Sequence, residues 1–252
     1  MRRREFIKLV AASTATWPLV AQAQQNRTRR VGVIMGLAEN APETNARVRA
    51  LRLGMRDLDW VEGRNVQIEY RFTEANMDLI NKYVAEMIKS APDVIVANSS
   101  PVVAALKSAT STIPVVFVIV NDPVGQGFIS NLKRPGGNIT GYSFIEPEII
   151  GKWINLLSDV KPDLSRVKLM FNPDTAPYYD RFLQSFKASP GHSSVEISAA
   201  RVSSAADVDL ALAQLGRERG GGLIACSDPY IVSARGAIVN AARQYSLPVL
   251  SP

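Results

Sequence analysis

Short apolar runs alternate with longer amphipathic segments from residue 31 to the end of the chain. The run Val31-Gly32-Val33-Ile34-Met35 is typical of a strand. In the segment that follows, apolar residues recur at three- and four-residue spacing, which predicts a helix with one apolar face. These residues are Val48, Leu51, Met55 and Leu58. Strands that alternate with helices in this way form parallel sheets covered by helices, so we expect an α/β fold.

The alternation is interrupted once, between Asn121 and Gly141. This segment contains five glycines and two prolines and shows no clean periodicity, so we interpret it as a crossover between two lobes. Before it we expect strands at 31–35, 66–70, 94–97 and 115–120 and helices at 44–58, 77–90 and 101–109, the last with Ser100 as N-cap. After it we expect helices at 148–160, 178–188, 205–217 and 230–245 and strands at 167–171, 195–199, 222–226 and 248–250. The predicted fold is therefore two doubly wound parallel-sheet lobes, at 24–141 and 142–252.

Residues 1–23 read as an export signal. A basic start is followed by an apolar stretch from Phe6 to Val20 and by the small-residue pattern Ala21-Gln22-Ala23, which predicts cleavage after Ala23. The apolar stretch is too short for a membrane-spanning helix of about 20 residues. The segment from Arg3 to Lys8 is similar to the twin-arginine signal of the bacterial Tat route. An ordinary secretory signal is the alternative, and either would place the protein in the periplasm.

Charge and rare residues exclude several classes of function. The formal net charge is +6, but the first eight residues supply half of it and the other charges are scattered, which argues against nucleic-acid binding. A single cysteine cannot form an intramolecular disulfide, and a single histidine cannot supply a multi-histidine metal site. That residue, His192, has no neighbouring acid or cysteine and is expected to be solvated. We therefore expect no metal, no cofactor and no enzymatic activity.

The residues that directly follow several of the predicted strands are mostly polar. Ligands of parallel α/β sheets bind beyond the carboxyl ends of the strands, so these residues are the candidates for a binding site. They are Leu37 and Ala38 after the first strand, Asn98, Ser99 and Ser100 after the third, Asp122 after the fourth, and Asn172, Ser227 and Asp228 in the second lobe. We expect Asp122 and Asp228 to face a cleft between the lobes, where either could pair with an ammonium group. Helix capping and turn formation are the alternative roles for these residue types.

Two motifs carry a resemblance to a known family. Asn121-Asp122-Pro123-Val124-Gly125 and Arg134-Pro135-Gly136-Gly137-Asn138-Ile139-Thr140-Gly141, supported by 58–66 and 92–97, resemble the periplasmic substrate-binding proteins of ABC transporters that include tryptophan- and tyrosine-binding members. The resemblance runs from Arg30 to the end of the chain. It implies a type I binding-protein fold whose lobes close on a small molecule, without catalytic activity. It also implies that the protein is a monomer and that its partner is an ABC permease in the inner membrane.

The resemblance also carries an expectation about length. Relatives usually continue well beyond a strand like Leu247-Pro248-Val249-Leu250, so we expect the second lobe to be incomplete at its C-terminal end.

The leading hypothesis on function is uptake of a small molecule, such as an amino acid. A ligand-binding partner of a membrane sensor would use the same cleft and is the first alternative. An exported α/β enzyme is the second, although no nucleophile and base can be assembled from the candidate residues.

Overall fold

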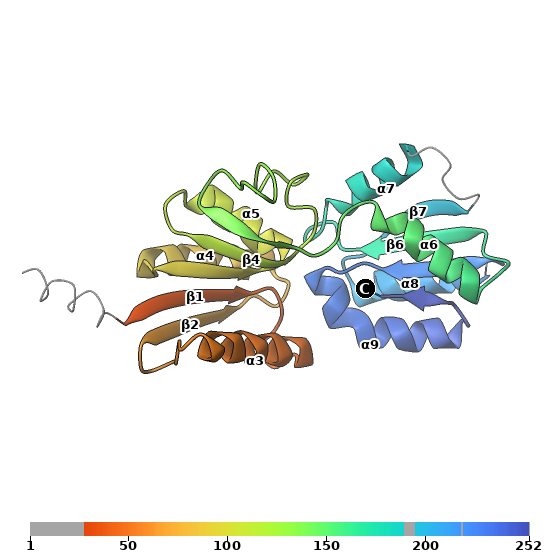
Figure 1. The fold of residues 1–252 in the computed structure, drawn as a ribbon. Coiled ribbons are helices and arrows are strands. Elements are labelled where there is room, and N and C mark those ends of the chain that lie inside the picture. Colours follow the sequence, from red (N-terminus) through yellow and green to blue (C-terminus); the bar gives the residue numbers. More distant parts are fainter. Residues whose placement is uncertain (1–27, 189–194, 218, 252) are drawn as a thin grey trace, which may run out of the picture.

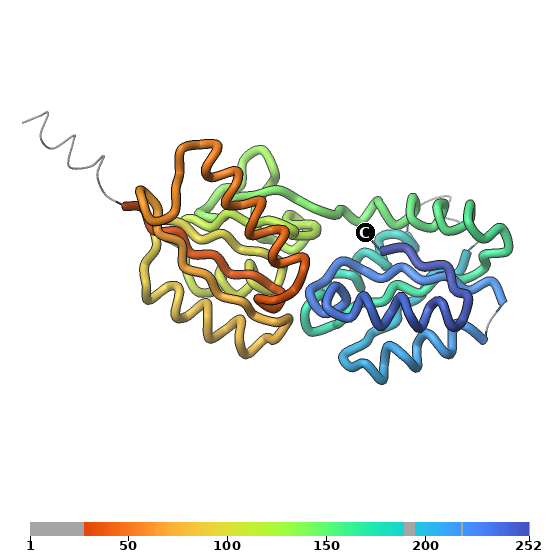
Figure 2. Tube along the Cα trace, turned by 90° about the horizontal axis from the view of Figure 1, so that it is seen from below, coloured from red at the N-terminus to blue at the C-terminus, as the bar shows by residue number. Residues whose placement is uncertain are grey.

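The computed structural model describes residues 28–188, 195–217 and 219–251. The expected export signal and His192 lie outside these residues. Within them the chain forms two α/β lobes, each built on its own parallel sheet, and the two lobes lie side by side along the long axis of the molecule (Figures 1 and 2). The chain passes from the first lobe to the second through residues 144–148, which connect β5 to α6.

The first lobe holds a five-stranded sheet in the order β2-β1-β3-β4-β5, with every neighbouring pair parallel. Its elements are β1 (Arg29–Met35), α3 (Pro42–Asp57), β2 (Val66–Phe72), α4 (Met77–Ser90), β3 (Val94–Asn98), α5 (Ser100–Ala109), β4 (Val115–Val120) and β5 (Ile139–Ser143). Helices α4 and α5 cover one face, where Ile80, Met87, Ile95 and Phe117 share a buried core. Helix α3 covers part of the other face, over β1 and β2.

The second lobe holds a four-stranded parallel sheet in the order β7-β6-β8-β9. Its elements are α6 (Ile149–Val160), β6 (Arg166–Phe171), α7 (Tyr179–Ala188), β7 (Glu196–Arg201), α8 (Ala205–Arg217), β8 (Gly221–Ala225), α9 (Pro229–Gln244) and β9 (Val249–Leu250). Helices α6 and α7 pack on one face of this sheet, around Phe171 and Phe182. Helices α8 and α9 pack on the other face, around Leu212 and Leu223. Helices on both faces of each sheet confirm the expected doubly wound fold class.

Two local features differ from the sequence-based expectation. Part of the expected crossover, Ile139–Ser143, is strand β5, which pairs with β4, so the division expected after residue 141 falls inside a strand of the first sheet. The expected N-cap of α5 is also wrong by one residue. Ser99 is the N-cap and Ser100 begins the helix, because the backbone at Ser99 has φ 93° and interrupts the strand before the helix starts.

Strand β5 depends on a glycine at the position where it approaches β4 most closely. A Cβ atom on Gly141 would lie 2.2 Å from the backbone oxygen of Phe117, which no rotation of a side chain can relieve. Glycine inside a strand is typical of such a close backbone approach. The same residue weakens the sequence signal for a strand, which explains why β5 is hard to recognise from the sequence.

We expect Gly141→Ala to lower the free energy of unfolding by about 1–3 kcal/mol, because the added methyl group overpacks the β4–β5 contact. Gly54→Ala is the matched control, since a Cβ atom there would meet nothing within 4 Å and Gly54 lies inside α3. Alanine is the better helix former, so this control should stabilise the protein by up to about 1 kcal/mol. Urea unfolding of both variants measures the difference, and equal stability of the two would contradict the close-approach argument.

Candidate functional site

Residues that follow strands of both sheets line a narrow cleft between the lobes. The cleft holds about 20 Å³, room for about one water molecule. Its lining residues are Leu37, Arg47, Asn98, Ser99, Ser100, Ile119, Tyr178, Ser227, Asp228, Pro229 and Val232. The first six of these residues belong to the first lobe and the last five to the second. Asp228, Pro229 and Val232 come from the N-terminal end of α9. Both helix starts at the cleft, those of α5 and α9, therefore belong to the candidate site.

A cationic side chain, Arg47, projects from α3 into the cleft. Its Nη1 donates a hydrogen bond to Oδ1 of Asn98, 3.2 Å away, at the end of β3. Burial lowers the pKa of Arg47, while the nearby carboxylate of Glu43 raises it. Glu43 also forms an ion pair with Arg235 of α9, at 3.5 Å, so that one ion pair connects α3 of the first lobe with α9 of the second.

Three residues near the strand ends of the first lobe that face the second lobe have strained backbone conformations. Ser99, Ile119 and Asp122 have φ values of 93°, 56° and 41°. The left-handed region is unfavourable for residues with a side chain and is rare for a β-branched residue such as isoleucine. Strained residues of this kind cost about 1–3 kcal/mol each and cluster at functional sites. Two of the three, Ser99 and Ile119, line the cleft.

The two lobes are joined at the cleft by the side chain of Asn121. Its Nδ2 lies 3.0 Å from the Tyr178 hydroxyl, 3.2 Å from the Tyr179 hydroxyl and 3.1 Å from the backbone oxygen of Ser227. The two tyrosine rings stack at a tilt with their centroids 4.8 Å apart. Burial raises the pKa of both tyrosines, so both are neutral phenols. The cleft is therefore closed by an amide of one lobe held among hydrogen-bond acceptors of the other.

Asp228 organises the wall of the second lobe. As the N-cap of α9 it accepts a hydrogen bond from the backbone N–H of Ile231 at 3.0 Å, and it also accepts from the Asn172 N–H at 3.2 Å and the Thr175 hydroxyl at 3.3 Å. Burial raises the pKa of Asp228 to about 6, because the loss of hydration outweighs these hydrogen bonds, which lower it. Since protein donors occupy both carboxylate oxygens, the observed role of Asp228 is to fix the start of α9.

Several buried polar atoms around the cleft have no hydrogen-bond partner within the described part of the chain. They are Nδ2 of Asn98, Oγ of Ser99 and Oδ1 of Asn121, and a fourth, Oγ1 of Thr44, lies one helical turn before Arg47. Buried polar groups are nearly always hydrogen-bonded, and a group left without a partner costs about 1–3 kcal/mol. Three of these atoms, on Asn98, Ser99 and Asn121, belong to residues at or just after the ends of β3 and β4.

The structure brings together most of the residues proposed from the sequence. Leu37, Asn98, Ser99, Ser100, Ser227 and Asp228 all line the cleft. Asn172 lies behind it and donates its N–H to Asp228. Ala38 is partly buried and does not line the cleft. Asp122 lies between the lobes but outside the lining, where its carboxylate accepts from the Gly125 N–H and pairs with Arg181 of α7 at 3.7 Å.

Five cleft residues were not identified from the sequence: Arg47, Ile119, Tyr178, Pro229 and Val232. Arg47 lies inside a helix, Ile119 inside an apolar strand and Tyr178 just before α7, while Pro229 and Val232 belong to the first turn of α9. The described residues contain no cluster of three or more histidine, cysteine, aspartate or glutamate side chains that could hold a metal ion. None of the helices described is long and apolar enough to span a membrane. The cleft offers hydrogen-bonding groups and one guanidinium, which suit recognition of a small polar molecule.

Comparison with known proteins gives matches over most of the chain. The family model described as ABC transporter substrate binding protein matches residues 30–252. A tyrosine-binding protein of Clostridioides difficile is 27% identical over 118 residues, which are 47% of this chain and 34% of that protein, so the matched region spans about a third of this curated relative.

Solved structures share the fold. The crystal structure of a conserved domain protein from Vibrio cholerae superposes with a TM-score of 0.79 and 27% identity, covering 89% of this chain and 74% of the other. The structure of an ABC domain in complex with L-Trp from Streptococcus pneumonia has a TM-score of 0.75 and 19% identity, with the same coverage. The family is one of binding proteins rather than enzymes. Since the family model matches nearly all of the chain outside its first 29 residues, the chain belongs to the ABC transporter substrate-binding protein family.

Proposed function

We propose that this protein is the periplasmic solute-binding component of an ABC uptake transporter and that it captures a small molecule, such as an amino acid, in the cleft between its lobes. The observation that carries the proposal is the group of unpartnered polar atoms on Asn98, Ser99 and Asn121 beside the Arg47 guanidinium. The strain at Ser99 and Ile119 supports the same location. A permease in the inner membrane would receive the solute, and we expect the protein to act as a monomer.

The chemistry of the cleft favours a solute with a carboxylate. Arg47 supplies a positive charge, and the start of α5 adds the partial positive charge of a helix N-terminus at Ser99 and Ser100. The names of two similar proteins, which refer to tyrosine and L-Trp, support an amino acid. Asn121 and Ser227 would then present an amide oxygen and a backbone oxygen as acceptors for an ammonium group. Asp228 has the supporting role of holding α9 in place.

Binding requires the lobes to separate, because the closed cleft of about 20 Å³ is far smaller than an amino acid. Opening would break the hydrogen bonds of Asn121 to Tyr178 and Tyr179 and the ion pairs Glu43–Arg235 and Asp122–Arg181. Contacts between the solute and the protein would then replace some of these contacts between the lobes. Such hinge closure around a ligand is a well-established type of motion in two-lobed binding proteins.

We expect at least one of the standard amino acids to raise the melting temperature of the protein, because a ligand that binds only the folded state stabilises it by mass action. For that amino acid, Arg47→Ala should weaken binding by about 10–100-fold, which corresponds to the loss of a charge-assisted hydrogen bond of about 1.5–3 kcal/mol. Isothermal titration measures the affinity. Mass spectrometry of molecules that copurify with the protein would identify the solute if it is not an amino acid.

Arg243→Ala is the control for that experiment, since Arg243 is an exposed arginine in the last turn of α9. It should bind the solute as tightly as the unmodified protein does. If no amino acid shifts the melting temperature and nothing copurifies, or if the solute binds equally well to Arg47→Ala, the proposed site is wrong.

We expect Asp228 to make stability depend on pH. Its raised pKa means that the folded state favours the protonated form, so the ionised carboxylate lowers the free energy of unfolding above pH 6. This penalty should fall as the pH drops through 6 and vanish below the ordinary aspartate value of 3.8. At 1.36 kcal/mol per pKa unit, it amounts to at most about 3 kcal/mol.

Asp228→Asn isolates this effect, because asparagine can still cap α9 but does not ionise. Between pH 7 and pH 4 the unmodified protein should gain stability relative to the variant, as measured by urea unfolding at several pH values. Parallel pH profiles would contradict the buried-carboxylate argument. The same variant tests the supporting role, since a loss of solute affinity as large as that of Arg47→Ala would show that Asp228 binds the solute directly.

Export to the periplasm rests on residues 1–23, which lie outside the described part of the structure. Changing Arg3 and Arg4 together to lysine should leave uncleaved precursor in the cytoplasm, because the Tat receptor reads the two arginines. Immunoblots of cytoplasmic and periplasmic fractions measure the outcome. If the amount of mature periplasmic protein does not change, the general secretory route suffices.

A further inference from the structure

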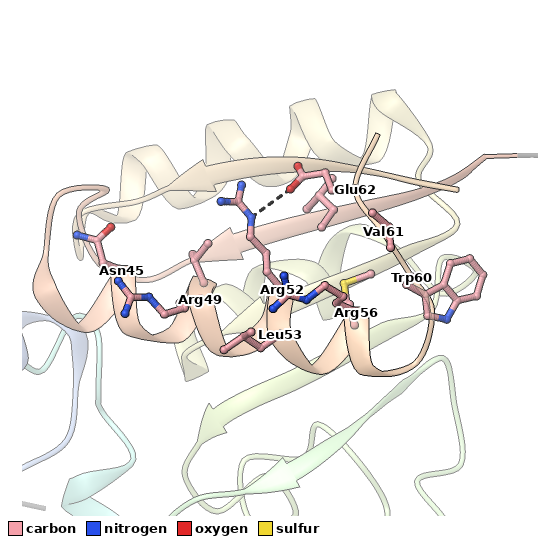
Figure 3. Close-up of a pocket in the computed structure, with 11 residues that line it drawn as sticks. Asn45, Arg49, Arg52, Leu53, Arg56, Trp60, Val61 and Glu62 are labelled. Carbon is pink, nitrogen blue, oxygen red and sulfur yellow. Dashed lines mark ion pairs between the residues drawn. The ribbon is translucent and has the colours of Figure 1, made fainter. Parts of the chain in front are cut away.

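A second concave surface lies on the outside of the first lobe, away from the cleft. It is a groove of about 600 Å³ between α3, the segment that follows α3, and the edge strand β2 (Figure 3). Val48 and Ile68 are among its apolar lining residues. Trp60 lies at the end near the C-terminus of α3. The groove shares no lining residue with the cleft.

Three arginines line the groove along one side of α3. Arg52 is already held, because its Nε lies 3.1 Å from both the Glu62 carboxylate and the Tyr70 hydroxyl. Arg49 and Arg56 are exposed, and neither has an acidic partner among the described residues. Glu62 is the sole acidic residue in the described lining. The groove therefore carries two uncompensated positive charges.

Apolar side chains lie beside these charges. Leu53 is 42% exposed and lies on α3 between Arg49 and Arg56, while Trp60 is 40% exposed. Arg49 and Arg56 are seven residues apart, which separates them by two helical turns, or about 10 Å along the helix axis. Arginine and tryptophan are the residue types most enriched among the residues that dominate binding energy at protein interfaces.

We propose that this groove is the docking site for an acidic, amphipathic helical segment of a partner protein. Two carboxylates spaced two helical turns apart would meet Arg49 and Arg56, and an apolar residue between them would contact Leu53 and Trp60. Arg52, held by Glu62 and Tyr70, fixes the wall of the groove against which the segment packs.

The charges argue against the other occupants of such a groove. A second copy of the chain related by two-fold symmetry would place the same arginines against each other, and like charges repel. A small dicarboxylate could pair with the arginines but would leave the exposed side chains of Leu53 and Trp60 uncovered. The proposed segment satisfies both arginines at once.

A synthetic peptide tests the proposal on the full chain. The probe is a capped helical peptide with two glutamates seven residues apart and a leucine four residues after the first. Titration at low ionic strength should shift the fluorescence of Trp60 and saturate, and Trp60→Phe identifies the contribution of that residue. The double variant Arg49→Glu, Arg56→Glu should bind at least tenfold more weakly. Raising the ionic strength from about 0.05 to 0.5 M should also weaken binding, since salt screens exposed charges.

The control is Arg134→Glu combined with Arg243→Glu, which makes the same change of charge at two exposed positions outside the groove. This variant should bind the peptide as the unmodified protein does, and thermal melts establish that both double variants are folded. No saturable shift, equal binding of a peptide with glutamines in place of the glutamates, or an equal shift with glutarate would overturn the proposal. Sedimentation that shows a dimer abolished by the Arg49 and Arg56 changes would assign the groove to a second copy instead.

Discussion

The closed arrangement of the two lobes depends on one buried amide. Asn121 stands at the end of β4 and directs its Nδ2 group toward two phenolic oxygens and a backbone oxygen of the second lobe. An amide provides two hydrogens, so these three acceptors share them, and the amide oxygen is left without a partner. The contact holds the lobes together but does not satisfy every polar atom it buries. A molecule that entered the cleft could therefore replace it at little net loss of hydrogen bonding.

In the second lobe, a network of hydrogen bonds around Asp228 supports the residues that contact Asn121. Asp228 connects the start of α9 to Asn172 and Thr175, which follow β6, so the ends of two neighbouring strands and one helix are tied to a single carboxylate. Ser227, which accepts from Asn121, immediately precedes this carboxylate. The first lobe contributes Arg47, whose position depends on how α3 lies across β1 and β2. A displacement of α9 is therefore transmitted both to the Asn121 contact and to the Glu43–Arg235 ion pair.

The order of strands and helices could be predicted from the sequence, because burial on both faces of a parallel sheet produces apolar runs such as 115–120 that need no long-range information. The strand-end rule also located six cleft residues, since it depends on topology alone. Strand β5 was missed because Gly141, which the close contact with Phe117 requires, weakens the strand signal. Arg47 and Tyr178 were missed because their place in the cleft is decided by how one helix and one lobe pack against another. The exclusion of Asp122 from the lining has the same cause, because an exposed arginine of the opposite lobe attracts its carboxylate.

The ion pair between Glu43 and Arg235 has a consequence for kinetics. Its side chains are 31% and 45% exposed, so dissolved ions reach both of them. An exposed pair contributes only about 0–1 kcal/mol, and salt reduces that contribution further. If lobe separation is the slow step that releases a bound solute, the residence time of that solute is set partly by this pair. The ionic strength of the surrounding fluid would then change the retention time of each captured molecule by about fivefold at most.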